Sequence, residues 1–236
     1  MVYITGDTHG DFTRIMYFCR RMKTTKDDIM IVLGDAGINY CLNNRDIMLK
    51  KQLAKMPITL FCIHGNHEAR PANIDTYKEI EWHGGIVYIE EEYPNIIFAK
   101  DGEVYDFETE SGINKKCIVI GGAYSVDKYY RLRNGWEWFE DEQPSDEIKK
   151  YVESQLEKYN WEVDIVLTHT CPICYEPIEW FLKGLDQSTV DKTTEMWLGN
   201  IEFKLKYNKW YCGHYHGEKK IAKMQFMFES IDVLTQ

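Results

Sequence analysis

The sequence predicts an α/β fold in which two β-sheets pack together in one domain and helices cover them. Three observations favour this class. The first third of the chain alternates apolar runs rich in Val and Ile with segments of helical periodicity, the part after residue 85 contains closely spaced short strands, and 236 residues suit a single domain. Because the chain contains no internal repeat, linker or low-complexity tract, we expect residues 1–236 to form one unit.

The first third of the chain has a βαβαβ pattern. Residues 2–5, 29–33 and 58–63 are short apolar runs of the kind that form buried parallel strands. Between them, residues 11–23 and 43–55 space their apolar side chains as one face of a helix does. This order predicts right-handed crossovers on one sheet.

The rest of the chain predicts a second group of strands. An antiparallel meander is expected from four short strands separated by turn residues, at residues 86–89, 96–99, 103–107 and 117–120. Ser145 follows Pro144 and is a suitable N-cap for a helix over residues 145–159. Further strands are expected at residues 163–167, 209–212, 218–222 and 226–229.

The composition excludes some classes of function. A net charge of −10 and a pI near 5.2 argue against an extended nucleic-acid footprint, although they leave room for a small site in which metals hold a nucleotide or a short nucleic acid. No apolar run is long enough to span a membrane, and the N-terminal residues lack the features of a signal peptide. An odd number of cysteines, seven, mostly within apolar runs, favours reduced thiols and a cytoplasmic location. Cys171 and Cys174 match C-x-x-C without a second such pair, so two small residues in a turn are a simpler interpretation than a zinc or redox site.

Chemically active side chains follow five of the predicted strands, each at the point where the strand ends. Ligands of an open α/β sheet gather outside the carboxyl ends of its strands, so these side chains are expected to converge. The segments are Gly6-Asp7-Thr8-His9-Gly10-Asp11, Gly34-Asp35-Ala36-Gly37, His64-Gly65-Asn66-His67-Glu68, Thr168-His169-Thr170 and Gly213-His214-Tyr215-His216-Gly217.

Asp, His and Asn together form an oxygen and nitrogen donor set that suits Mn, Fe, Zn or Mg. Two cations about 3.5–4 Å apart require a carboxylate that bridges them, and such a pair clamps the attacking and leaving oxygens of an in-line displacement. Alone, Asp-x-His and Gly-Asp are weak signals, since an isolated Asp-x-His is usually a capped turn, and Gly-Asn-His-Glu and Gly-His-x-His are moderately specific. Their order, spacing and placement after strands indicate one metal site.

The ordered segments resemble the calcineurin-like metallophosphoesterase superfamily. Its pattern is Asp-x-His, Gly-Asp, Gly-Asn-His-(Asp/Glu), an isolated His and Gly-His-x-His, and the resemblance covers residues 7–216. It implies a four-layer α/β/β/α sandwich, with two mixed sheets flanked by helices. It also implies two divalent cations, for which manganese is the first expectation.

The resemblance assigns a role to each matching residue. The implied ligands are Asp7, His9 and His216 for one metal, Asn66, His169 and His214 for the other, and Asp35 as the bridge. His67 matches the catalytic histidine, which contacts the phosphate and protonates the leaving oxygen. An imidazole suits this task because its pKa lies near the working pH.

Two narrower resemblances keep the substrate open. The Ser/Thr protein phosphatases share Gly-Asp-x-His-Gly and Gly-Asn-His-Glu, but they carry an arginine shortly after the second aspartate, whereas here Tyr40 ends the segment and the first arginine is Arg45. The RNA lariat debranching enzymes, which cut phosphodiesters, are similar in Gly-Asn-His-Glu-Ala and in a later glycine-rich segment, here residues 120–125.

Two further segments are candidates for substrate contact. Residues 123–138 combine aromatic side chains with Lys128, Arg131 and Arg133, a mixture that suits a phosphate and a stacked base, although a solvated loop over the sheet would have the same composition. Residues 175–199 form either a cap over the cleft or a helical packing face. Arg70, two residues past Glu68, is placed to reach a phosphate or to form a surface salt bridge.

Together these features predict a metal-dependent phosphoric ester hydrolase that acts on a phosphodiester or a small phosphate ester. A protein phosphatase is the alternative enzyme. A non-catalytic scaffold on the same fold is the alternative of another class, and it would be marked by loss of ligands, whereas all eight positions are filled here.

Overall fold

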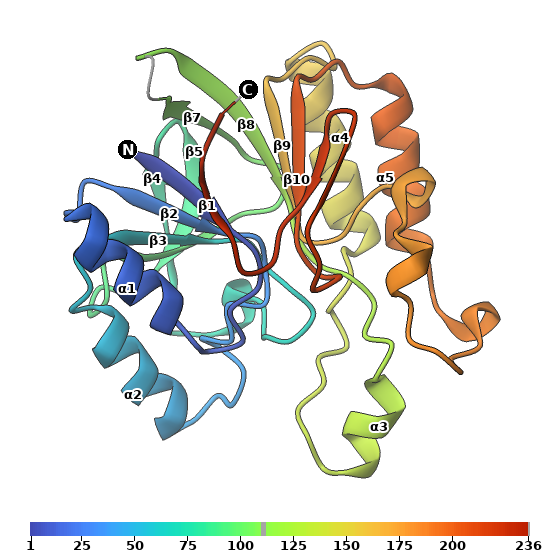
Figure 1. Cartoon of the computed structure of the whole chain (residues 1–236), viewed down its shortest axis with the longest axis horizontal. Coiled ribbons are helices and arrows are strands. Elements are labelled where there is room, and N and C mark those ends of the chain that lie inside the picture. The colour runs from blue at the N-terminus through green and yellow to red at the C-terminus, as the bar shows by residue number, and fades with distance from the viewer. Residues whose placement is uncertain (110–111, 236) are drawn as a thin grey trace.

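Two β-sheets lie face to face between two layers of helices (Figure 1). The computed structural model describes residues 1–109 and 112–235. Helices α1 (Thr13–Met22) and α2 (Asn44–Leu53) cover one sheet, and α4 (Asp146–Lys158) and α5 (Thr193–Lys204) cover the other. The predicted four-layer sandwich of two mixed sheets flanked by helices is confirmed.

The first sheet has seven strands in the order β13-β1-β2-β3-β6-β5-β4. Its centre is the predicted βαβαβ unit, in which β1 pairs with β2 and β2 with β3, both in parallel. The bounds are β1 (Val2–Thr5), β2 (Ile29–Val32), β3 (Thr59–Cys62), β4 (Lys78–Trp82), β5 (Gly85–Ile89), β6 (Ile96–Ala99) and β13 (Ile231–Val233).

The second sheet has six strands in the order β11-β12-β10-β9-β8-β7. Strands β8, β9, β10 and β12 run parallel to one another, so their carboxyl ends lie at the same edge of the sheet. The bounds are β7 (Val104–Glu108), β8 (Asn114–Ile120), β9 (Ile165–Thr168), β10 (Lys209–Cys212), β11 (Lys219–Ile221) and β12 (Met224–Phe226).

The main core lies between the sheets. Strand side chains alternate between the two faces, so Ile4 and Ile31 point into this core while Tyr3 and Met30 pack against the outer helices. From the second sheet, Leu167 enters the same core. Amphipathic helices cover the outer faces, with Ile15 and Phe18 of α1 on one side and Val152 and Leu156 of α4 on the other.

The predicted meander forms only in part, because β5 and β6 pair antiparallel, as do β7 and β8, but the two pairs lie in different sheets. Strand β6 pairs in parallel with β3, and β7 and β8 form a hairpin in the second sheet. The apolar pattern of each strand is sufficient to find it, but both sheets bury the same kind of side chain, so the pattern does not state which sheet a strand joins. The edge strand β4 is not predicted because its side chains are mostly exposed.

The C-terminal strands also differ from the prediction. In place of a strand at residues 226–229, β12 ends at Phe226 and β13 pairs antiparallel with β1. Ser145 does cap α4, since its side chain accepts a hydrogen bond from the Ile148 amide. Within the part of the chain that the structure describes, no helix combines the length and apolarity needed to cross a membrane.

Candidate metal centre and active site

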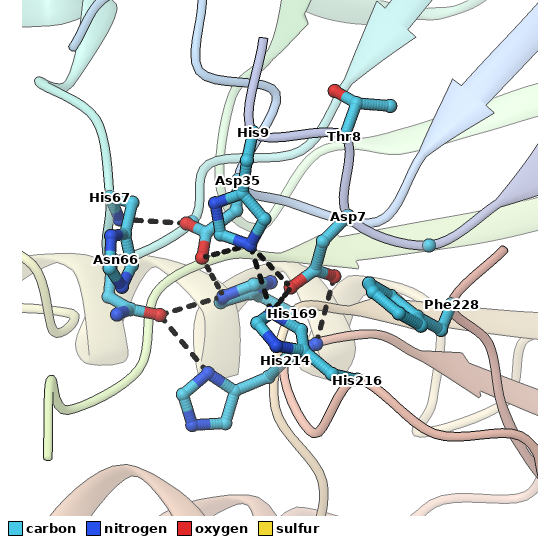
Figure 2. A network of polar contacts seen from close by, with 12 residues as sticks. Asp7, Thr8, His9, Asp35, Asn66, His67, His169, His214, His216 and Phe228 are labelled. Atoms are coloured by element: carbon cyan, nitrogen blue, oxygen red, sulfur yellow. Dashed lines mark hydrogen bonds and ion pairs between the residues drawn. The ribbon is translucent and has the colours of Figure 1, made fainter. Parts of the chain in front are cut away.

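All eight metal and catalytic residues predicted from the sequence come together at one edge of the two sheets (Figure 2). Strands β1, β2 and β3 are followed by five of them in the first sheet, and β9 and β10 by the other three in the second. Because all these strands end at the same side of the sandwich, residues as far apart in sequence as His9 and His216, 207 positions, become neighbours. The eight are Asp7, His9, Asp35, Asn66, His67, His169, His214 and His216.

One group of candidate ligands consists of Asp7, His9 and His216. One donor atom from each lies within 4.8 Å of the other two. The His216 Nε2 is 3.3 Å from Asp7 Oδ2 and 2.9 Å from His9 Nε2. Three side chains thus direct donor atoms at a common point.

A second group consists of Asn66, His169 and His214. The Asn66 Oδ1 is 2.9 Å from His169 Nε2 and 3.1 Å from His214 Nδ1. The other nitrogen of His169, Nδ1, is 2.7 Å from the Leu33 carbonyl oxygen, so this hydrogen bond leaves Nε2 to act as the ligand atom.

Asp35 lies between the two groups. Its Oδ2 is 3.5 Å from His169 Nε2 and 3.9 Å from His9 Nε2, while Oδ1 accepts a 2.7 Å hydrogen bond from the His67 amide. A carboxylate shared in this way between two sets of donors has the position of a bridging ligand.

The electrostatics of the site call for positive charge. Burial alone would raise the pKa of Asp35, but His169, His67 and His9 outweigh it and hold that pKa well below its ordinary value. Burial likewise opposes a charge on His169, yet Asp35 raises the pKa of His169 to about 9. Among the described residues no well-aligned hydrogen bond reaches the buried Asp7 Oδ2, and the His216 Nε2 approaches it at 3.3 Å. Two buried carboxylates with nitrogen donors around them fit a pair of divalent cations of the Mn, Fe, Zn or Mg type.

The backbone around the site is bent to bring the ligands together. Four of the residues have a left-handed backbone, which residues other than glycine rarely adopt. Their φ angles are 47° for His9, 46° for Asp35, 68° for His214 and 49° for His216. Such strain persists only where the surroundings enforce it, and it concentrates at functional sites. Gly65 permits the close approach, because a Cβ there would overlap Asp35.

A buried hydrogen-bonded pair behind Asn66 is not predicted from the sequence. The Asn66 Nδ2 donates to Ser125 Oγ at 2.9 Å, and Arg131 Nη1 donates to the same oxygen at 3.2 Å. This bond fixes which end of the Asn66 amide faces His169 and His214. Ser125 lies in the glycine-rich segment of residues 120–125, but nothing in the sequence relates it to Asn66.

Arg131 is the predicted substrate contact that the fold buries completely. Its Nε and Nη2 find no hydrogen-bond partner among the described residues, and its Nη1 is 4.0 Å from Asp127 Oδ1. Ser125 therefore links the Arg131 guanidinium to the candidate ligand Asn66 by two hydrogen bonds. The Nε and Nη2 donors of the guanidinium remain unmatched by any described residue.

The other three predicted substrate contacts lie in different surroundings. Arg133 is exposed, and Lys128 lies 3.8 Å from the centre of the Trp138 ring. Arg70 donates to Asp101 Oδ2 at 2.5 Å, so a salt bridge forms, but both side chains are largely buried and the pair does not lie at the surface as predicted. Arg70 is buried as well and its Nη2 has no partner among the described residues, whereas Arg131 is fully buried and leaves two nitrogens, Nε and Nη2, unmatched.

A cavity of about 550 Å³ adjoins the ligands. Asp35, His67 and His214 line one side, and the segment from Glu176 to Glu195 lines the other. Both interpretations of residues 175–199 therefore hold in part, since the first residues border the cavity and Leu198 of α5 packs in the core.

The C-x-x-C pair forms no bond between its sulfurs. Cys171 is buried, Cys174 is exposed, and both are free thiols. The short turn that contains them precedes the wall of the cavity.

The sandwich and its edge of Asp, Asn and His side chains define a metal-dependent hydrolase of phosphoric esters. The sequence profile of the calcineurin-like phosphoesterases matches residues 1–218, and the chain belongs to that family. No curated protein matches the chain.

Solved structures are similar to this protein at low identity. TT1561 of Thermus thermophilus shares the fold, with 12% identity, a TM-score of 0.51, and 96% of this chain and 87% of that chain covered. The protein is also similar to the phosphopantetheinyl hydrolase PptH from Mycobacterium tuberculosis, with 14% identity, a TM-score of 0.48 and the same shares of 96% and 87%.

Proposed function

We propose that this enzyme hydrolyses a phosphodiester or a small phosphate ester, with His67 as the general acid. The observation that carries the proposal is the position of Asp35 between two groups of candidate ligands, with His67 directly beside it. We further propose manganese as the native metal, and a cytoplasmic location because all seven cysteines are free.

Asp7, His9 and His216 would hold one cation, Asn66, His169 and His214 the second, and Asp35 both. When bound, the pair would supply positive charge to the phosphate oxygens and lower the pKa of a water, so that hydroxide is available to attack phosphorus near neutral pH. Asp35 accepts a hydrogen bond from the backbone amide of His67 and so fixes the position of that residue at the cavity wall.

The imidazole of His67 is suited to give a proton to the leaving oxygen. Burial first, and the positive charge of Arg131 in addition, lower the pKa of His67 against the opposing charge of Asp35. A lowered pKa makes the imidazolium a stronger acid but reduces the protonated fraction at neutral pH, and general acid catalysis is worth about 10²–10⁴-fold in rate. The half-buried ring of His67 borders the cavity, which gives it access to a bound ester.

The charges around the cavity favour a diester monoanion over a monoester dianion. Among the described residues that line it, Lys192 is the one Lys or Arg, and it is paired with Glu176 at 2.7 Å. Tyr40 stands in the segment where the protein phosphatases carry an arginine. A monoester dianion would therefore meet less positive charge here than it requires.

The test compares hydrolysis of bis(p-nitrophenyl) phosphate and p-nitrophenyl phosphate by the manganese-loaded enzyme. Turnover of the diester supports the proposal. Turnover of phosphoserine peptides without any diester hydrolysis would restore the protein phosphatase alternative.

Arg131 is fully buried and does not line the cavity, so we propose that it acts from behind the candidate ligands: it donates to Ser125, which in turn holds Asn66. Its positive charge lies on the side of Asn66 away from the cavity, where it would favour an anion at the metal centre without contacting it. Arg131→Gln should raise the KM for the diester by about fivefold or more, because this buried charge is lost. The exposed Arg133 provides the matched control, and Arg133→Gln should leave KM within about twofold. Equal KM values for both variants would remove Arg131 from the proposed site.

A further inference from the structure

The cavity beside the metal ligands has the position of a site for the organic part of the substrate. It is continuous from Asp35 and His67 to the segment that begins at Glu176. A phosphate held at the metal centre would direct its ester group into this space. About 550 Å³ is within the range of cavities that enclose a small organic ligand.

One wall of the cavity is apolar. It consists of Trp180, Phe181, Leu182, Leu185 and Val190. The exposed fraction of Leu182 is 64%, and no described part of the chain covers it. An apolar group that entered the cavity would remove this surface from water, a gain of about 25 cal/mol for each Å².

The wall is fixed to the loop that carries His214 and His216. The Trp180 ring lies against Gly217 so closely that a Cβ there would overlap it, and its edge faces Phe226 with a centroid distance of 5.7 Å. An ion pair between Glu179 and Lys219 ties the same segment to β11. A flat group on Trp180 would therefore have a constant distance from the metal ligands.

The polar end of the cavity has an acceptor without a donor. Glu195 is 4% exposed, and its Oε1 accepts a 2.7 Å hydrogen bond from Thr170 Oγ1. Its Oε2 is buried and receives no hydrogen bond from any residue that the structure describes. Glu176 is compensated by Lys192, so Glu195 is the carboxylate that a ligand is needed to satisfy.

The remaining charges restrict the ligand further. Asp127 and Asp191 also line the cavity, so a second phosphate at this end would meet carboxylates. Burial raises the pKa of Glu195 to about 7, so at neutral pH a substantial share of the molecules carries the ionised acceptor, and this share grows as the pH rises. The ligand should therefore present N–H donors, with no further anionic group.

We propose that this cavity binds an aromatic ring system carrying an amino group, of the nucleobase type, which lies on the wall of Trp180 and Phe181 and donates an N–H to Glu195 Oε2. The proposal rests on the proposed function, because it takes the phosphate at the metal centre as the fixed end of the substrate. It deepens that function by naming the chemical class of the ester's organic group.

The test uses pairs of nucleotides that differ by one amino group. Adenosine 5′-monophosphate is compared with purine riboside 5′-monophosphate, and guanosine 5′-monophosphate with inosine 5′-monophosphate, as competitive inhibitors of bis(p-nitrophenyl) phosphate hydrolysis by the manganese-loaded enzyme. In at least one pair the amino-bearing member should bind about tenfold more tightly, as expected for a hydrogen bond to a carboxylate. Equal inhibition within both pairs overturns the proposal.

Two variants assign the effect to the cavity. Glu195→Gln keeps an acceptor for Thr170 and replaces Oε2 by a donor, so the ratio of inhibition constants within the pair should fall to about one. Glu202→Gln is the matched control in the same helix; its carboxylate accepts from Tyr207 instead of lining the cavity, and the ratio should persist. A ratio unchanged in Glu195→Gln overturns the assignment.

Leu182→Ala tests the apolar wall without touching the polar end. Because Leu182 is exposed, this variant should fold, and both members of a pair should bind about threefold to fivefold more weakly at an unchanged ratio. Unchanged inhibition constants overturn the placement of the ring. If the unmodified enzyme hydrolyses no diester, the proposed function is wrong, but the binding proposal is still open to test. Calorimetric titration of the enzyme with the same two pairs of nucleotides then decides it.

Discussion

Asp35 owes its importance to a position that no other described residue shares. It follows β2 closely, its backbone is left-handed, and its two oxygens face different partners. A neutral amide in this place would keep the hydrogen bond from the His67 amide but lose the negative charge that two cations require. We therefore expect binding of two metals to depend on Asp35 more than on any other single side chain.

Asp35→Asn should reduce the metal content at both positions, whereas His216→Ala should remove one ion. Elemental analysis of the purified variants after manganese loading measures this. Asp106→Asn, which alters a partly exposed carboxylate paired with Lys116 on β8, is the control and should keep the wild-type content. Two metals per chain in Asp35→Asn would show that the bridging assignment is wrong.

His67→Ala should keep both metals and the fold but lose most of the activity. The expected loss is about 10²–10⁴-fold for an alkyl ester, whose leaving oxygen needs a proton, and clearly smaller for an aryl ester, which leaves as a stable phenolate. Steady-state rates on matched methyl and p-nitrophenyl esters provide the comparison. An identical loss on both esters would exclude the general-acid role.

At the scale of the element, the segment before α5 and the first turn of α5 form the wall of the cavity. Residues 175–199 carry no strong helical period because the first half consists of short 3-10 turns that follow the cavity. The second half supplies the buried contacts with the outer face of the second sheet, through Leu198 and, further along α5, Ile201, while Trp180 of the first half packs against the same cluster only in part. Glu195 lies in the first turn of α5, where the segment of 3-10 turns gives way to the packed helix. It is buried by the fold and borders the cavity.

Buried Glu195 should make stability fall as pH rises. Its pKa is raised by burial to about 7 in the folded protein, so between its ordinary value of 4.5 and about 7 the folded state holds a proton that the unfolded chain has lost. The contribution of Glu195 to the free energy of unfolding is therefore present at low pH and is lost as the pH rises through 7. Each pKa unit corresponds to about 1.4 kcal/mol, so Glu195→Gln should lessen this loss by roughly 1–3 kcal/mol.

Urea unfolding of the metal-free protein at pH 5 and pH 8 measures the effect. Glu91→Gln is the control because the Glu91 side chain is 74% exposed and pairs at the surface with Lys78. Its difference between the two pH values should follow the wild type. The same difference in Glu195→Gln as in the wild type would contradict the buried state of this carboxyl.

At the scale of the whole molecule, the site joins the two sheets. Asp7, Asp35 and Asn66 come from the first sheet, and His169 and His214 from the second. In the metal-free protein, the like charges of the two aspartates and the unmatched Asp7 Oδ2 weaken the edge of a sandwich that the apolar core holds together. Cations bound between these side chains would tie both sheets at that edge.

Manganese should consequently stabilise the entire fold. A ligand at 100 times its dissociation constant adds about 2.7 kcal/mol, which for a domain of this size raises Tm by roughly 5–10 °C. Differential scanning calorimetry with chelator and with added manganese tests this. Asp35→Asn should show little of the increase, and an equal increase in that variant would place the stabilising ions elsewhere.

Much of this protein was determined by sequence alone. Short continuous runs rich in Val and Ile identified β1, β2 and β3, the helical period identified α1 and α2, and the Ser145 N-cap identified α4, because these patterns express local geometry. The candidate ligands could also be found from the sequence, since each follows a predicted strand and the carboxyl ends of parallel strands lie at the same edge of a sheet.

Tertiary structure alone decided what depends on contacts between distant segments. The assignment of β6, β7 and β8 to different sheets, the bond between Ser125 and Asn66, and the pairing of Arg70 with Asp101 all required the packed chain. The same holds for the cavity, because a side chain such as Glu195 has no partner or exposure until the fold surrounds it. Local patterns fix elements and their termini, while burial and charge are properties of the assembled whole.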